Sequence, residues 1–344
     1  MRFGIIGCGV IGPWHAKAIT SAKNAELVAV CDILPEKAKK VADEYGISSI
    51  YTNYQEMLES DTIEAVSICT PSGMHAEMGI AAARCGKHVL SEKPIDITLE
   101  KIDLLIDECK KANVKLGCIF QRRTSPMWRM IRDAITSGCM GKTVLGDAYL
   151  KYYRSQHYYD SADWRGTWEL DGGGALMNQG IHMIDLMRWI MGPIESVYAL
   201  CDHLVRNIDV EDTACAVIKY KSGAFGVLEG TTSVNPGMNH RLEFHGEHGT
   251  ILVDGEKIIK WDVPEITASC DVDGKGGVDV KIGTAHTPIT SEATEGHRLQ
   301  IEDFCEAIKM DREPSVSGEE ARKAVEVVLA IYESARTGLP IKFQ

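Results

Sequence analysis

The chain has 344 residues, of which 44% are hydrophobic and 25% charged, as expected for a globular protein with two domains. Its net charge of −12 disfavours nucleic acid as the main partner, because phosphate binding requires a basic surface. There is no apolar run of about 18 residues, no signal-peptide pattern and no CxxC pair among the eleven cysteines. These features predict a cytoplasmic protein with reduced thiols, no membrane partner and no metal site.

Residues 1–121 alternate strand and helix patterns, which predicts a parallel sheet with right-handed crossovers. We expect this region to be an α/β domain of the Rossmann type. Short apolar runs predict strands at 2–6, 26–30, 65–69, 88–91 and 115–120. The stretches between them predict helices at 13–23, 35–45, 74–85 and 99–112.

The pattern changes after residue 121, and we expect residues 122–344 to form a second, α+β domain. Gly, Asn and Asp turns separate its strands, which therefore look antiparallel and are predicted at 144–153, 194–201, 213–220, 226–232, 241–245 and 250–253. Helices are predicted at 126–137, 175–191, 295–310 and 318–337. The last helices belong either to this domain or to the surface of the first. A Gly-rich stretch at 271–283 predicts a surface loop or hairpin.

The first motif is a glycine loop, GCGVIG, from Gly7 to Gly12. It follows a predicted strand and opens a predicted helix, which is the context of a dinucleotide-binding loop. Gly7 would permit the tight turn, Gly9 would let the backbone approach a pyrophosphate, and Gly12 would allow close packing of helix and strand. Val10 and Ile11 complete the loop, and the helix N-terminus offers N–H donors to phosphates. A Rossmann-like domain without a cofactor is the alternative.

Asp32 ends the second predicted strand, twenty residues after Gly12. A carboxylate at this position accepts hydrogen bonds from the ribose hydroxyls of adenosine and repels a 2′-phosphate. Residues 33–35 contain no arginine that could hold such a phosphate. The sequence therefore favours NAD over NADP as the cofactor.

A lysine follows the predicted strand at 88–91, in the sequence Glu92-Lys93-Pro94. Ligands of open α/β sheets bind at the carboxyl ends of the strands, so we expect Lys93 at that edge. An ammonium group beside a nicotinamide can donate a hydrogen bond to a developing alkoxide. That is the chemistry of an alcohol dehydrogenase.

Several segments together carry a resemblance to a known family. They are the glycine loop, TPSGMH at 70–75, EKP at 92–94, DGGGALMNQGIHMID at 171–185 and HRLQIEDF at 297–304. On these segments, which extend over essentially the whole chain, the sequence resembles the Gfo/Idh/MocA family, the glucose–fructose oxidoreductase and inositol dehydrogenase group. The resemblance implies a Rossmann domain followed by a domain with a large, open, mostly antiparallel sheet. It also implies hydride transfer between a nicotinamide and a carbohydrate-like hydroxyl.

The resemblance further implies which residues are catalytic. Lys93 matches the catalytic lysine of the EKP motif, and His182 matches the usual acid/base histidine. Four positions earlier the inositol dehydrogenases have Asp, whereas this chain has Asn178, which speaks against inositol as the substrate. Asn178 and His182 would share one face of the predicted helix, so Asn178 could orient the substrate hydroxyl or His182. A neutral His182 could accept the hydroxyl proton.

Other site residues are expected around these groups. The cofactor site should include the glycine loop and Asp32 together with Thr70, Pro71, Ser72, His75, Glu92, Lys93 and Gln121. The substrate site should include Lys93, Arg122, Tyr152, Trp168, Asn178 and His182. A domain-linking salt bridge is the alternative for Arg122, and sheet packing is the alternative for the aromatic residues. Arg154 and Arg165 in the same region could hold a carboxylate or phosphate.

The resulting hypothesis is an NAD-dependent dehydrogenase that acts on a secondary hydroxyl, at C3, of a sugar, glycoside or nucleotide sugar. The run WRGTW at 164–168 and Asn178 look more like members that oxidise C3 of hexopyranosides or UDP-sugar uronates than like inositol dehydrogenases. The alternatives are a redox-neutral glycosidase with tightly held NAD, an inositol dehydrogenase, and a non-catalytic NAD or sugar sensor on the same fold. We expect a carbohydrate substrate and assembly as a homodimer or homotetramer.

Overall fold

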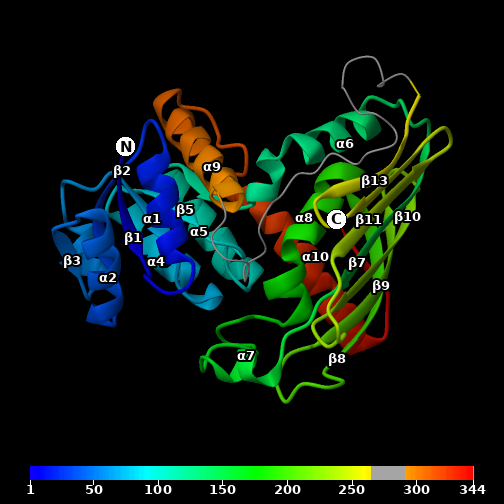
Figure 1. Ribbon diagram of the computed structural model, residues 1–344, viewed down its shortest axis with the longest axis horizontal. Helices are drawn as coiled ribbons and strands as arrows, with labels where there is room; N and C mark the ends of the chain where they lie inside the picture. Colours follow the sequence, from blue (N-terminus) through cyan, green and yellow to red (C-terminus); the bar gives the residue numbers. More distant parts are fainter. Residues whose placement is uncertain (265–290, 344) are drawn as a thin grey trace. The chain divides into compact units, whose positions relative to one another are not determined.

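The computed structural model describes residues 1–264 and 291–343 (Figure 1). It divides into two compact units, each made of two stretches of chain. The first unit comprises the described residues of Met1–Thr124 and Ile282–Val325, and the second those of Ser125–Lys281 and Glu326–Gln344. The Gly-rich stretch at 271–283, predicted as a loop or hairpin, lies outside the described residues.

The first unit is built on a six-stranded parallel sheet in the order β3-β2-β1-β4-β5-β6. The strand order reverses between β1 and β4, and open α/β sheets bind ligands beyond the carboxyl ends of the strands at such a switch point. This is the Rossmann arrangement that the alternating pattern predicted. The strands are β1 (Arg2–Ile6), β2 (Glu26–Cys31), β3 (Ser49–Tyr51), β4 (Ala65–Ile68), β5 (His88–Ser91) and β6 (Leu116–Cys118).

Helices pack against this sheet and bury its apolar side chains. Ile19, Val41 and Phe304, from α1, α2 and α9, share one buried cluster with residues of β1 and β2. The helices of this unit are α1 (Gly12–Ser21), α2 (Pro35–Tyr45), α3 (Tyr54–Leu58), α4 (His75–Arg84), α5 (Leu99–Lys111) and α9 (Ser291–Lys309), with short 3₁₀ turns η1 (Ser72–Met74) and η2 (Gln121–Thr124).

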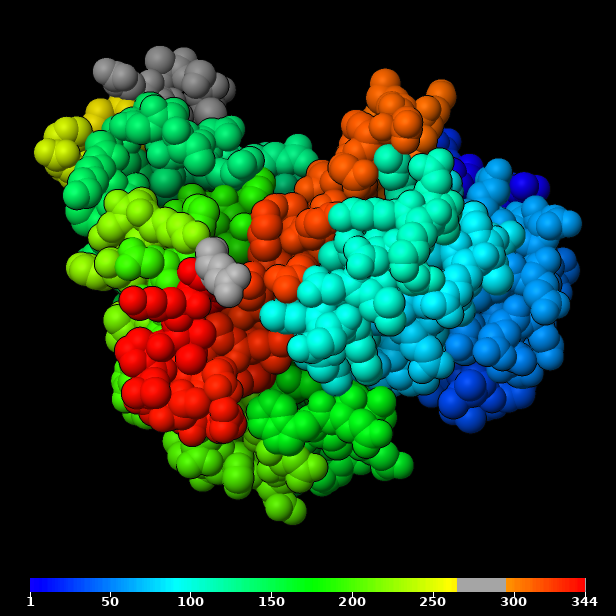
Figure 2. Space-filling view, turned by 180° about the vertical axis from the view of Figure 1, so that it is seen from behind, coloured from blue at the N-terminus to red at the C-terminus, as the bar shows by residue number. Residues whose placement is uncertain are grey.

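Segments far apart in the sequence meet in this unit. α9 lies alongside α1 (Figure 1), and the backbone N–H of Lys23 donates a hydrogen bond to Glu302, 279 positions later. α10 (Gly318–Thr337) begins in this unit and contains the division between the two units. Its orange-red start lies beside the cyan residues of α5 in Figure 2. Arg322 of α10 forms an ion pair with Asp103 of α5.

The second unit is built on an eight-stranded sheet in the order β13-β12-β11-β7-β10-β9-β8-β14. Its neighbouring strands are antiparallel except for β7 and β10, which pair in parallel. The strands are β7 (Thr143–Lys151), β8 (Ile194–Asp202), β9 (Thr213–Tyr220), β10 (Phe225–Thr231), β11 (His240–Gly246), β12 (Thr250–Asp254), β13 (Lys257–Asp262) and β14 (Ile341–Lys342).

One face of this sheet is covered and the other is exposed. Along β9 the side chains alternate, with Ala216 and Ile218 buried and Val217 exposed, as expected for a sheet with one covered face. α8 packs on β7. The helical segments of this unit are α6 (Pro126–Thr136), α7 (Gln156–Asp160), the π-helical turn η3 (Ala175–Gly180) and α8 (Ile181–Met191).

Five helices and strands of the structure were not predicted from the sequence, namely β3, α3, α7, β13 and β14. Each is short or lies at a sheet edge, where the apolar pattern is weak. The predicted helix at 175–191 is present, but its first part is the wider π-helical turn η3. Asn178 therefore lies in a π-helical turn, whereas His182 lies in the regular helix α8.

Within 1–264 and 291–343, no helix combines the length and the apolar composition that a membrane crossing requires. The cysteines in these ranges are free thiols.

Candidate active site

The glycine loop lies at the carboxyl end of β1, and its geometry explains its glycines. Gly7 has φ +98°, and a Cβ atom there would lie 2.6 Å from the carbonyl oxygen of Cys69. A side chain on Gly12 would overlap the carbonyl oxygen of Gly7. At Gly9, in contrast, a Cβ atom would meet nothing within 4 Å. The first and third glycines are thus required by packing, whereas the second faces open space in which a ligand can approach the backbone.

Asp32 is hydrogen-bonded to the glycine loop. Its Oδ2 accepts a 2.8 Å hydrogen bond from the backbone N–H of Cys8, and its Oδ1 accepts one of 2.9 Å from Leu34. The side chain is partly exposed. Because each carboxylate oxygen has two lone pairs, both oxygens retain acceptor capacity for ribose hydroxyls.

Two of the predicted cofactor residues have buried oxygens that bond to nothing in the described chain. They are Oγ1 of Thr70, after β4, and Oε1 of Gln121, at the start of η2. Buried polar atoms are normally hydrogen-bonded, so an unsatisfied pair near the strand ends fits a site that a polar ligand completes. Pro71 and Ser72 follow Thr70, and Ser72 is buried at the start of η1.

His75 is held between two backbone carbonyl groups. Its Nδ1 lies 2.7 Å from the carbonyl oxygen of Pro94, and its Nε2 lies 2.9 Å from that of Thr70. The side chain is 1% exposed. Both ring nitrogens are therefore engaged by backbone, so His75 joins the segments that follow β4 and β5, and its predicted contact with the cofactor stays a prediction.

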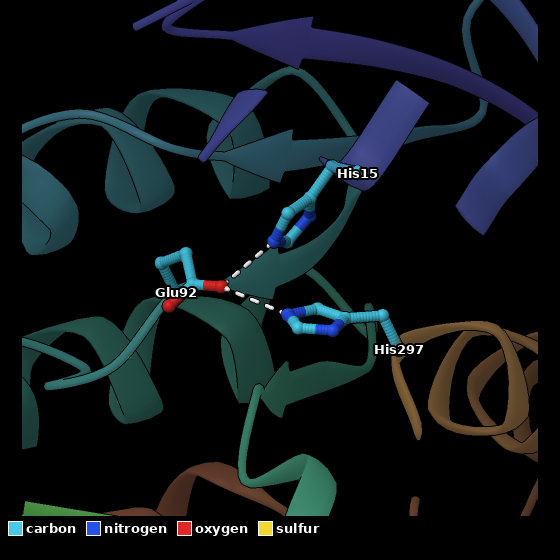
Figure 3. Close-up of side chains that lie close together, drawn as sticks. All are labelled: His15, Glu92 and His297. Carbon is cyan, nitrogen blue, oxygen red and sulfur yellow. Dashed lines mark hydrogen bonds and ion pairs between the residues drawn. The ribbon is translucent and has the colours of Figure 1, made fainter. Parts of the chain in front are cut away.

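The carboxylate of Glu92, just after β5, is the centre of a buried cluster (Figure 3). Its Oε1 lies 2.7 Å from Nε2 of His15 and 3.6 Å from Nε2 of His297. Its Oε2 accepts a 2.9 Å hydrogen bond from the backbone N–H of Lys93. None of the three clustered side chains is more than 7% exposed. The cluster thus joins the helix that follows the glycine loop, the strand end before Lys93, and α9.

The protonation states of this cluster follow from burial and hydrogen bonding. Burial would raise the pKa of the Glu92 carboxyl, but hydrogen bonds from His15 and His297 outweigh it and hold that pKa well below its usual value. Burial lowers the pKa of His15, against the opposing effect of Glu92. Near neutral pH Glu92 is therefore ionised and His15 is neutral, with its proton on Nε2. Nδ1 of His15 then accepts the 2.6 Å hydrogen bond from Oγ of Ser67.

Two histidines and a carboxylate are also a possible ligand set for a divalent metal ion. The three ligand atoms lie within 4.8 Å of one another. However, two ligands at about 2.0–2.1 Å from a tetrahedral zinc ion would stand roughly 3.3 Å apart. His15 and Glu92 are closer, at 2.7 Å, which is a hydrogen-bond distance. The geometry therefore supports a cluster that shares a proton.

Glu92 supports the backbone of Lys93. Both of its carboxylate oxygens are engaged inside the first unit, and its predicted contact with the cofactor stays a prediction. Lys93 itself is partly exposed. Arg122, in η2, is 5% exposed, which is unusual for a charged side chain and implies that its charge is paired.

In the second unit, a buried carboxylate accepts hydrogen bonds from the start of the helical segment that leads to His182. Glu211, 3% exposed, accepts hydrogen bonds from the backbone N–H groups of Gly174 (2.9 Å) and Leu176 (2.8 Å) and from the hydroxyl of Tyr332 (2.8 Å). Burial raises the pKa of Glu211 to about 7, although the three donors favour the ionised form. N–H groups at a helix start have no partner within the helix, so Glu211 determines where η3 begins.

Asn178 lies in η3, and its amide is hydrogen-bonded on both sides. Its Nδ2 donates to Oδ1 of Asp171 at 2.5 Å, and its Oδ1 accepts from Nε2 of Gln179 at 2.7 Å. These bonds orient the side chain, and an amide cannot act as a base near neutral pH. His182, in the first turn of α8, is partly buried. It is therefore the residue of this pair that can take up a proton.

Two aromatic residues predicted at the substrate site also lie in this unit. Trp168 is 50% exposed, and its ring stands perpendicular to that of Tyr332 at 5.3 Å between ring centroids. Tyr152 is partly buried, and its backbone N–H donates to the carbonyl of Thr231. The exposed indole of Trp168 offers the kind of face that packs on sugar C–H groups.

Sequence reasoning missed His15, the role of His297 and Glu211. His15 follows Gly12 by three residues and lies on the buried side of α1, so its spacing from the glycine loop was a usable signal. The clustering of His297 with Glu92 gave no local signal, because the two are far apart in the chain. Glu211 precedes β9 in a segment without a recognisable motif.

Comparison with known proteins identifies the family. Residues 1–120 match the family described as "Oxidoreductase family, NAD-binding Rossmann fold", and residues 128–252 match the "GFO/IDH/MocA C-terminal domain". Both descriptions agree with the resemblance that the motifs indicated.

Individual relatives cover the whole chain or most of it. Myo-inositol 2-dehydrogenase from Thermotoga maritima is 29% identical over 350 residues, which cover 100% of this chain and 99% of the relative. D-glucoside 3-dehydrogenase from Escherichia coli is 31% identical over 257 residues, 73% of this chain and 68% of the relative. The WlbA dehydrogenase from Bordetella pertussis, whose crystal structure contains NADH and UDP-GlcNAcA, is 32% identical in sequence. The two structures match with a TM-score of 0.88, over 100% of this chain and 98% of that one. The chain therefore belongs to the GFO/IDH/MocA family of NAD-binding oxidoreductases, whose members act as sugar and polyol dehydrogenases.

Proposed function

We propose that this protein catalyses NAD-dependent oxidation of the C3 hydroxyl of a sugar, glycoside or nucleotide sugar. The observation that carries the proposal is the likeness over the whole chain, at 32% identity, to a dehydrogenase solved with NADH and UDP-GlcNAcA. The 31% identity to a D-glucoside 3-dehydrogenase supports oxidation at C3. The amide at position 178, where inositol dehydrogenases are expected to have a carboxylate, supports a substrate other than inositol.

In this proposal Lys93 and His182 are the two reacting groups of the protein. Nζ of Lys93 donates a hydrogen bond to the substrate oxygen and stabilises its developing negative charge. The imidazole of His182 accepts the hydroxyl proton, and Asn178, oriented by Asp171 and Gln179, positions the substrate hydroxyl. Gly9 and Asp32, with Thr70 and Gln121, hold the cofactor. The nicotinamide of bound NAD supplies the hydride acceptor.

The proposal is tested with a panel of substrates and two pairs of variants. Production of NADH is followed with methyl glucosides, glucuronides, UDP-sugars and inositols. Lys93→Ala and His182→Ala are expected to lower kcat by at least a hundredfold while NAD affinity stays within a few fold. Lys39→Ala and His203→Ala, at exposed positions in the same units, serve as matched controls. Full activity in either active-site variant, or loss of NAD binding in both, would contradict the assigned roles.

Inositol oxidation is the second candidate, because the relative from Thermotoga maritima matches the whole chain at 29% identity. The same panel separates the two. A kcat/KM for an inositol that exceeds those of all glycosides and nucleotide sugars would favour the polyol function and overturn the C3 proposal. In that case Asn178→Asp is expected to raise inositol turnover further, because it restores the carboxylate expected in inositol dehydrogenases.

We also propose that copies of the chain associate through the exposed face of the second unit's sheet. Tyr198, Leu200, Val217 and Phe225 lie on this face and are 43% to 66% exposed. A contiguous apolar surface of this kind is typical of an interface. Leu200→Glu is expected to shift the mass measured by light scattering toward the monomer. Leu204→Glu, equally exposed at 66% but outside the strands, is the control.

A further inference from the structure

Two arginines surround one tyrosine in the second unit. The guanidinium carbon of Arg165 lies 4.3 Å from the ring centroid of Tyr158, and that of Arg154 lies 5.6 Å from it. Nη1 of Arg165 also donates a hydrogen bond to the hydroxyl of Tyr158. Arg165 additionally contacts the ring of Trp164, at 4.6 Å. The two cations are therefore held close together by aromatic contacts.

Neither of these arginines has an acidic partner among the described residues. Arg154 donates to the carbonyl of Tyr153 and to Oε1 of Gln179, and Arg165 donates to Tyr158. The Nε atoms of both arginines are buried and have no acceptor in the described chain. Burial lowers the pKa of Arg154, and the positive charge of Arg165 lowers it further. Two neighbouring, partly buried cations without a carboxylate are unfavourable until an anion joins them.

The pair is connected to the residues that are proposed to hold the substrate. Nε2 of Gln179 donates to the hydroxyl of Tyr158 at 3.0 Å and to Oδ1 of Asn178 at 2.7 Å. Arg154 donates to the same Gln179 at 2.8 Å. One hydrogen-bonded network therefore runs from the two arginines to the amide in η3. An anion bound at the arginines would therefore lie next to the residues proposed to hold the substrate.

We propose that Arg154 and Arg165 form a subsite for one oxyanion carried by the substrate. The inference rests on the proposed sugar dehydrogenase function and narrows its substrate class to acidic sugars. The guanidinium fork binds carboxylate and phosphate oxygens with paired hydrogen bonds, so the anion is a carboxylate on the sugar or a phosphate ester. Arg165 contributes the fork, because its Nε has no acceptor among the described residues. Arg154 adds the second positive charge.

The experiment compares charged and neutral forms of one sugar. Initial rates with NAD are measured for methyl glucuronide, glucose 6-phosphate and methyl glucoside, and for UDP-glucuronate against UDP-glucose. The variants are Arg165→Met, Arg165→Lys and Arg154→Met. Arg132→Met is the matched control, since Arg132 stacks on Trp189 at 4.6 Å and also has a buried Nε without an acceptor, but lies on α6.

If the subsite exists, replacing its arginines should lower kcat/KM for acidic sugars more than for neutral ones. Arg165→Met should lower kcat/KM for the preferred acidic sugar about a hundredfold and for its neutral counterpart less than threefold. The loss of kcat/KM for the acidic sugar in Arg165→Lys should lie between these values. Arg132→Met should have the same kcat/KM as the wild type. Preference of the wild type for the glucuronides identifies a sugar carboxylate, whereas preference for glucose 6-phosphate identifies a phosphate. An equal loss for charged and neutral sugars would overturn the proposal, because it would mean that the arginines are only structural.

A binding measurement separates this inference from the proposed function. Thermal stabilisation by glucuronate or glucose 6-phosphate, with NADH present, is compared between the wild type and the arginine variants. If no sugar is oxidised but the acidic sugar still stabilises the wild type and fails to stabilise Arg165→Met, the dehydrogenase proposal fails and the subsite stands. If stabilisation is the same in all variants, or absent in the wild type, the subsite is refuted whether or not turnover is seen.

Discussion

Nε2 of His15 and Oε1 of Glu92 lie 2.7 Å apart, and neither side chain reaches solvent appreciably. One belongs to the helix that follows the glycine loop, and the other to the strand end that precedes Lys93. The cofactor loop and the proposed catalytic lysine are thus joined by a single buried hydrogen bond. Its partners are an ionised carboxylate and a neutral imidazole, so the bond is strong and its loss leaves a buried charge.

Removal of the imidazole should destabilise the first unit. His15→Ala leaves the buried Glu92 carboxylate without its nearest donor, and a buried group that loses a hydrogen-bond partner costs about 1–3 kcal/mol, more when it is charged. Urea denaturation should show this loss. His203→Ala, at an exposed position beside Asp202, should stay within about 0.5 kcal/mol of the wild type. An equal effect of both substitutions would argue against a special role for the cluster.

Neutralising the carboxylate should affect catalysis more than cofactor binding. Glu92→Gln has one acceptor oxygen in place of two, so either His15 or the backbone of Lys93 loses its partner. We expect kcat to fall about tenfold through misplacement of Lys93, with the Kd for NADH changed less than threefold. Stopped-flow rates and NADH fluorescence titration measure the two quantities. Glu77→Gln, in which an exposed hydrogen bond from Tyr54 is altered, is the control.

Replacing Asp32 should relax the choice of cofactor. Asp32→Ser removes the charge that repels a 2′-phosphate and keeps a hydroxyl near the N–H of Cys8. The ratio of kcat/KM for NADP to that for NAD should rise at least tenfold, about 1.4 kcal/mol. Asp43→Ser, which removes only an exposed ion pair with Lys39, should leave the ratio unchanged. An unchanged ratio in Asp32→Ser would refute the assignment of Asp32 to the ribose.

The stability of the second unit should depend on the titration of Glu211. Its pKa of about 7 in the folded protein lies above the unfolded value near 4.3, so the folded state binds the extra proton between these values. The contribution of Glu211 to the free energy of unfolding is therefore fully present below about pH 4.3. It is lost as the pH rises to about 7, and its size is on the order of 3 kcal/mol. Glu211→Gln should lack this component of the pH dependence in urea titrations at pH 5 and 8. Glu195→Gln, at an exposed ion pair with Lys219, should retain it.

Much of the fold could be predicted because the signals were local. The glycine loop, the buried strand at His88–Ser91 and the helix at Gly318–Thr337 each show a pattern within one element, and their bounds agree closely with the structure. β13 and β14 lack such a pattern, since sheet-edge strands bury few side chains. The turn η3 could not be predicted because Glu211, which bonds its first N–H groups, is 35 to 37 positions away.

The sequence proposed residues for the candidate site but could not predict their hydrogen bonds. Lys93, His182 and Asn178 were identified from motifs, and their roles remain proposals. The inward orientation of Glu92 and the engagement of both nitrogens of His75 were not foreseen. Sequence spacing indicates which strand end a residue occupies, but the side chain turns toward whichever partner the packing brings within hydrogen-bond distance.

The sequence by itself determined the alternation of strands and helices, the glycines that the first loop requires and the acidic residue that favours NAD. Each of these depends on residues that are neighbours in the chain or repeat with the period of one element. Only the tertiary structure decided that His15 and His297 meet on Glu92, and that two arginines share Tyr158 with no acidic partner in the part of the chain that the structure describes. These contacts depend on how whole elements pack, because burial determines which charges must find partners and where a missing partner leaves room for a ligand.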